Sequence, residues 1–141
     1  HQYLKHHWLV EGPLHRDLHH FFEEAYTEAQ AHLDALAERM TTLGAVPTGS
    51  MRALSAKSQL EPEAEGEFPI RVMLKSDLEN EQVLIASLGK AIKKAMELSD
   101  FGSETLLKKV LLEREERAHE LDHYLSRDSV LKAESDENSP S

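Results

Sequence analysis

Histidines and carboxylates recur at helical spacing in the first third of the chain. His19 and Glu23 are four residues apart, and so are Asp34 and Glu38. Residues at this spacing lie on one face of an α-helix, so the two members of a pair can bind one metal ion. Mixed nitrogen and oxygen ligands suit Fe(II), Zn(II) or Mn(II). The spacing therefore predicts two metal-binding half-sites.

The two pairs cannot bind the same ion within one chain. An offset of fifteen residues separates them by about 22 Å along a helix and returns them to within about 60° of the same face. A helix packed antiparallel against its own copy would bring His19 and Glu23 beside Glu38 and Asp34 of the partner subunit. The sequence therefore predicts a dimer with two identical intersubunit sites and a two-fold axis near Glu28.

His7 offers a further nitrogen ligand. A chain reversal at Gly12-Pro13 would bring it close to His19, and Trp8 would then lie near the metal. A simpler interpretation also stands, because acidic surface helices often carry charge pairs at this spacing without any function, and isolated histidines are usually solvated. Spacing alone leaves both interpretations open.

Apolar residues at alternating intervals of three and four predict the helices that would carry these side chains. Long helices are expected over residues 14–43, 69–99 and 104–127. Residues 1–10 have the pattern of a first helix truncated at its N-terminus, and residues 50–58 that of a short helix inside a connection. Residues 101–103 are expected to form a turn, with Ser103 as the N-cap of the last helix.

No segment alternates as a β-strand does. The prediction is an all-α, ferritin-like four-helix bundle with a short helix in its crossover connection, over residues 1–131. An acidic, Ser-rich tail over residues 132–141 is expected to be disordered. The chain opens at His1 without Met, so we expect the native N-terminal residues to be missing.

Composition excludes several classes of protein. The 141 residues contain no cysteine, which excludes thiolate metal sites and disulfide scaffolds. The formal net charge of -10 argues against a surface that binds duplex DNA. No apolar run reaches the length of a membrane span, and nothing resembles a signal peptide. We therefore expect a cytoplasmic protein that does not bind membranes.

The first fifty residues resemble the Dps family of mini-ferritins, the DNA-binding proteins from starved cells. The matching motifs, in order, are His7-Trp8, Glu11-Gly12-Pro13, Leu18-His19, LDALAER over residues 33–39 and LGAVP over residues 43–47. The similarity continues more loosely through residues 111–125, and their sequence, LLEREERAHELDHYL, resembles that of the DpsA subgroup.

The resemblance implies iron storage and detoxification by a homo-oligomeric, dodecameric shell that protects against oxidative stress. Fe(II) would be oxidised to Fe(III), preferentially by hydrogen peroxide, and stored as a ferric mineral, and zinc could substitute for iron. The implied ferroxidase site takes His7, His19 and Glu23 from one subunit and Asp34 and Glu38 from its two-fold mate, with Trp8 as the nearby aromatic that intercepts radicals. Glu23 stands where many members have Asp.

Other features have more than one interpretation. Asp100 and Glu104 could favour a helix N-terminus or line an iron-entry pore, and His119 and His123 could form an auxiliary metal site.

The family often binds DNA through basic arms, which this sequence lacks, so DNA binding is doubtful. The alternative functions are a DNA-binding protein that protects the nucleoid and a metal-sequestering shell without catalysis.

Overall fold

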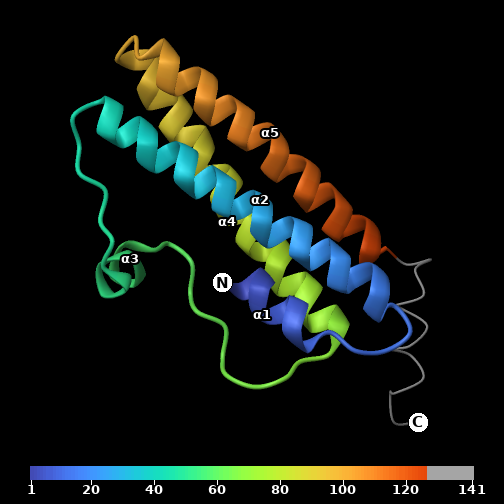
Figure 1. Cartoon of the computed structure of the whole chain (residues 1–141). Coiled ribbons are helices and arrows are strands. Elements are labelled where there is room, and N and C mark those ends of the chain that lie inside the picture. The colour runs from blue at the N-terminus through green and yellow to red at the C-terminus, as the bar shows by residue number, and fades with distance from the viewer. Residues whose placement is uncertain (127–141) are drawn as a thin grey trace.

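The computed structural model describes residues 1–126, which form five helices and no strand. The helices are α1 (Gln2–Leu9), α2 (His15–Thr42), α3 (Met51–Lys57), α4 (Ile70–Glu97) and α5 (Phe101–Tyr124). Helices α1, α2, α4 and α5 pack into one bundle, and α3 lies apart from it in the long connection between α2 and α4 (Figure 1). The predicted four-helix bundle with a short crossover helix is confirmed.

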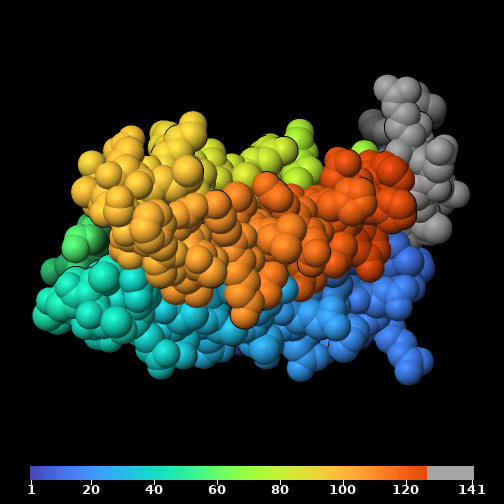
Figure 2. Space-filling view, turned by 90° about the horizontal axis from the view of Figure 1, so that it is seen from above, coloured from blue at the N-terminus to red at the C-terminus, as the bar shows by residue number. Residues whose placement is uncertain are grey.

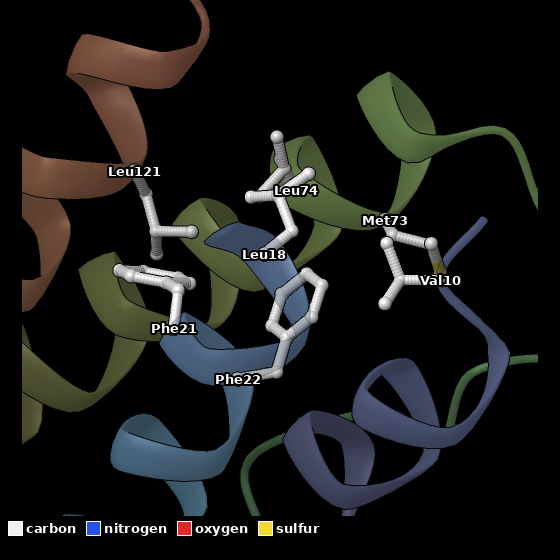
Figure 3. Close-up of a cluster of buried hydrophobic side chains, with 7 residues drawn as sticks. All are labelled: Val10, Leu18, Phe21, Phe22, Met73, Leu74 and Leu121. Carbon is white, nitrogen blue, oxygen red and sulfur yellow. The ribbon is translucent and has the colours of Figure 1, made fainter. Parts of the chain in front are cut away.

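The core lies at the end of the bundle where α1 packs against α2 and α4. Its fully buried members project from α2, α4, α5 and the residue after α1 toward one another (Figure 3). They are Val10, Leu18, Phe21, Phe22, Met73, Leu74 and Leu121. An isolated eight-residue helix is only marginally stable in water, so α1 depends on this packing for its position.

The four bundle helices follow the apolar periodicity of the sequence closely. The predicted helix over residues 14–43 is α2, and the one over residues 69–99 is α4. Helix α3 begins after Ser50, whose hydroxyl oxygen accepts a hydrogen bond from the Ala53 amide. Helix α5 lies on one face of the molecule between α2 and α4 (Figure 2).

The predicted start of the last helix is wrong by one turn. Helix α5 begins at Phe101 instead of Glu104, and Ser103 is a helical residue instead of the N-cap. Asp100 is the N-cap, because its carboxylate accepts a hydrogen bond from the Ser103 amide at 3.1 Å. The Arg39 side chain also contacts Asp100 at 2.8 Å, and this contact from α2 fixes the carboxylate in the capping position. The expected disordered tail, residues 132–141, lies outside the described residues.

Candidate metal centre

His7 and His19 form a reciprocal pair between α1 and α2. Their rings stack with centroids 3.8 Å apart. His7 Nδ1 lies 2.8 Å from the backbone carbonyl oxygen of His19, and His19 Nδ1 lies 2.8 Å from that of His7. The reversal that brings the rings together passes through Gly12, whose φ of 98° is the left-handed conformation that favours glycine.

The pairing determines which nitrogen of each ring can bind a metal. A carbonyl oxygen only accepts hydrogen bonds, so both Nδ1 atoms must carry their hydrogen. In a neutral imidazole, the other nitrogen, Nε2, then keeps a free lone pair. A backbone carbonyl that holds Nδ1–H in this way is the usual outer support of a metal-binding histidine. The pair therefore presents two oriented nitrogen ligands.

Two further rings pack against the pair. His15 stacks on His19 with centroids 5.2 Å apart, and Tyr26 meets His7 edge to face at 5.7 Å. Trp8, which follows His7, is 68% exposed. Trp8 therefore lies at the surface, next to His7 in the sequence.

The carboxylates of the predicted site all lie on α2, and all are exposed. Glu23 lines a polar hollow together with His19, at the same end of the bundle. Asp34 and Glu38 lie farther along α2, and nothing among the described residues brings them to the histidines. Within residues 1–126, no three histidines or acids are grouped so that they could hold a metal ion. The described residues of one chain therefore bring together His7 and His19, place Glu23 along a hollow with His19 but not His7, and leave the second carboxylate pair apart.

Sequence analysis did not single out His6. His6 is fully buried. Its Nδ1 lies 2.7 Å from the Asp77 carboxylate of α4, and its Nε2 lies 2.9 Å from Glu63 in the crossover connection. Burial opposes a charged imidazole, but the two carboxylates outweigh it and raise the pKa of His6. The sequence feature that could have indicated its burial is its position. His6 follows Tyr3 by three residues and precedes Val10 by four, which places it on the inward-facing side of α1.

Sequence reasoning also missed a charged network inside the bundle. Arg114 of α5 donates to Glu81 of α4 at 2.9 Å and forms an ion pair with Glu28 of α2. Tyr3 of α1 donates to the same Glu81 oxygen at 2.5 Å. Both Glu81 and Arg114 are at most 3% exposed. Glu and Arg are residue types that usually lie at the solvated surface. Only the packing shows that these side chains link all four bundle helices.

The auxiliary candidates have partners within the chain. Asp100 caps α5, and hydrogen bonds from Ser103 and Arg39 lower its pKa. Glu104 forms an ion pair with Lys108 at 2.6 Å. The rings of His119 and His123 are exposed and tilted, with centroids 6.3 Å apart, and no third ligand among the described residues joins them. Asp100 therefore does act at the N-terminus of α5, as its N-cap.

The model of the ferritin-like domain matches residues 1–130. A nutrient stress-induced DNA-binding protein of Nostoc sp. is 40% identical over 92% of this chain and 70% of its own length. The DNA protection during starvation protein of Halobacterium salinarum is 37% identical over 93% of this chain and 72% of its own. The chain belongs to the Dps family of ferritin-like proteins.

Solved Dps structures share the fold of this Dps-family chain. The archaeal Dps homologue from Halobacterium salinarum aligns with a TM-score of 0.89 at 38% identity, over 92% of this chain and 72% of that one. The Dps protein of Vibrio cholerae O1 aligns with a TM-score of 0.84 at 26% identity, over 89% and 78%. That protein is described as a member of a broad superfamily of ferritin-like diiron-carboxylate proteins. Over the described residues, no helix has the length and apolar character needed to cross a bilayer.

Proposed function

We propose that this chain is a ferroxidase subunit of an iron-storing shell. It would oxidise Fe(II) to Fe(III), preferentially with hydrogen peroxide, and deposit the product as a ferric mineral. The single observation that carries the proposal is the reciprocal His7–His19 pair, which leaves two oriented Nε2 atoms free for a metal. Membership of the Dps family supports the same assignment.

The proposed site is completed by a second copy of the chain. Asp34 and Glu38 of the partner subunit would lie beside His7, His19 and Glu23, as the antiparallel pairing of two α2 helices requires. The incomplete ligand set of residues 1–126 supports an intersubunit site, since two histidines without a grouped acid are too few for a pair of iron ions. We infer a homo-oligomer, and the family resemblance favours a dodecamer.

Each residue type has a distinct task in the proposed reaction. Neutral imidazoles bind Fe(II) well, whereas hard carboxylate oxygens stabilise the trivalent product. Two Fe(II) ions supply two electrons to one peroxide, and two protons complete its reduction to two water molecules without releasing a radical. Trp8, exposed next to His7, is placed to intercept a stray one-electron oxidant. Zinc, which has similar ligand preferences but no redox chemistry, would bind and inhibit.

The decisive experiment loads Fe(II) anaerobically, adds hydrogen peroxide and follows ferric absorbance. We expect fast oxidation by the wild-type protein and a large loss of rate in Asp34→Ala. Glu79→Ala is the control, because Glu79 is an exposed carboxylate on α4, whereas the proposed carboxylate ligands all lie on α2. Equal rates for Asp34→Ala and the control, or no reaction with peroxide in any protein, would exclude the proposed site.

DNA binding is the second candidate, favoured by the names of the Nostoc and Halobacterium relatives. The net charge of -10 opposes it, because duplex affinity comes mainly from cationic contacts with phosphate. We expect no shift of linear plasmid DNA at physiological salt. A shift that weakens as salt rises would identify a DNA-binding surface.

A further inference from the structure

We propose that Tyr3, which is partly buried, is an electron donor to the ferroxidase site, with Glu81 as the acceptor of its proton. The inference rests on the proposed function, because the oxidant is hydrogen peroxide reacting with bound Fe(II). Tyr3 would supply the second electron when a site holds only one Fe(II) ion. No such role is needed when both iron positions are filled.

The Tyr3 hydroxyl is directed at a base. Its oxygen lies 2.5 Å from Glu81 Oε1, a short hydrogen bond in which the phenol donates. Burial, together with the charge of Glu81, raises the pKa of Tyr3 well above its ordinary value. The phenol therefore stays protonated, and it can lose an electron readily only if its proton leaves in the same step.

Glu81 is suited to receive that proton. It is 1% exposed, and burial raises its pKa, which makes the carboxylate a stronger base. Arg114 donates to the same oxygen at 2.9 Å and keeps the acceptor in place. The proton would reach Glu81 Oε1, the oxygen to which the phenol donates, while Oε2 is buried without a hydrogen-bond partner among the described residues.

Tyr3 lies close to the metal-binding histidines. It precedes His7 by one helical turn on the same face of α1, about 6 Å along the helix axis. Both residues pack on α2, where Tyr3 contacts Phe22 with centroids 6.4 Å apart and His7 contacts Tyr26 at 5.7 Å. Tyr3 and Tyr26 line one small cavity between the two helices. Tyr3 and His7 thus lie one helical turn apart, and both pack against aromatic rings of α2.

Hydrogen peroxide accepts one electron from Fe(II) and one from Tyr3, its O–O bond breaks, and two solvent protons complete two water molecules. Fe(II) becomes Fe(III). Tyr3 becomes a neutral phenoxyl radical, and its proton moves to the Glu81 carboxylate. No hydroxyl radical is released, so the tyrosine protects the shell at low iron occupancy.

The two other tyrosines of the chain are matched controls. Tyr26 is partly buried and touches His7, yet its hydroxyl has no hydrogen-bond partner among residues 1–126. Tyr124 packs on Phe21 with centroids 5.3 Å apart, and its hydroxyl likewise has none there. Among residues 1–126, neither phenol is hydrogen-bonded to a base, so proximity to iron and a hydrogen-bonded base can be tested separately.

The test uses the assembled protein loaded anaerobically with less than one Fe(II) per site. Peroxide is added, the sample is frozen rapidly, and the radical is followed by electron paramagnetic resonance, with ring-deuterated tyrosine to identify it. We expect a tyrosyl signal that is absent in Tyr3→Phe and retained in Tyr26→Phe and Tyr124→Phe. In Glu81→Gln it should form about 100-fold more slowly, the lower range for loss of a positioned proton acceptor.

Ferric absorbance recorded on the same samples separates the two proposals. Iron oxidation without a Tyr3 radical, or a radical that survives in Tyr3→Phe, overturns the role of Tyr3 and leaves the ferroxidase assignment intact. An unchanged radical in Glu81→Gln removes Glu81 from the step. No iron oxidation by peroxide at all overturns both proposals, since the oxidant would be missing.

Discussion

His7 and His19 each donate their Nδ1 hydrogen to the backbone carbonyl oxygen of the other, across the contact between α1 and α2. The reciprocity fixes both tautomers and both ring orientations at once. A change to either residue therefore disturbs two ligands, although only one side chain is altered.

His7→Ala and His19→Ala should each weaken Zn(II) binding to the assembled protein by more than about 100-fold. Losing a residue that only hydrogen-bonds to a metal ligand usually weakens metal binding by about 10- to 100-fold. Each of these substitutions should weaken it more, because it removes one histidine ligand and also disturbs the orientation of the other. Isothermal titration calorimetry measures the affinity. His20→Ala is the control, since His20 is an exposed neighbour paired with Glu24. A loss of affinity in His20→Ala as large as in His7→Ala would argue against this site.

Mixed oligomers should reveal whether the site is shared between subunits. His7→Ala and Asp34→Ala subunits, each inactive alone, are coexpressed in equal amounts. In a two-fold pair that contains one of each, one site has lost both residues and the other is intact. Random pairing then restores about one quarter of wild-type sites, measured as the amplitude of fast Fe(II) oxidation. If the mixed oligomer oxidised Fe(II) no faster than either single-variant oligomer, all the ligands would have to come from one chain.

The stability that the Asp100 N-cap gives to α5 should depend on its carboxylate acceptor and on pH. Asp100→Ala removes the acceptor for the Ser103 amide and should lower Tm by about 3 °C. Hydrogen bonds from Ser103 and Arg39 lower the pKa of Asp100 in the folded state. Its ionised form therefore contributes stability above its unfolded pKa, and that contribution is lost as pH falls through the lowered folded value.

Calorimetric scans from neutral to acid pH measure this effect. The difference in Tm between the wild type and Asp100→Ala should shrink in acid. Asp100→Asn keeps a neutral acceptor, so it should retain much of the cap and show a weaker pH dependence. A difference in Tm between wild type and Asp100→Ala that does not change with pH would contradict the role of the charge.

Removing Arg114 should destabilise the bundle strongly. Arg114→Met leaves the buried Glu81 carboxylate without its cation, a change that costs about 3–5 kcal/mol of unfolding free energy. Adding Glu81→Met removes the unpaired charge, and stability should recover in part. Chemical denaturation of the three proteins gives the comparison. A double variant less stable than Arg114→Met would show that the network acts as more than one charge pair.

Local sequence determined the helices and the ligand pairs. Three-and-four spacing of apolar residues places α2 and α4 to within two residues, because helical periodicity is a property of consecutive residues. The same spacing puts His19 and Glu23 on one face of α2, and the reversal at Gly12 follows from glycine's freedom at positive φ.

Tertiary structure alone decided which charged residues are buried. His6 and His7 are adjacent and chemically identical, yet one turns inward to Asp77, 71 residues away, and the other turns to His19. Asp100, whose capping bond with the Ser103 amide is local, likewise gains a hydrogen bond from Arg39, which is 61 residues distant. A polar side chain is buried only where a partner offsets its desolvation. Since these partners come from distant parts of the chain, local sequence spacing cannot identify them.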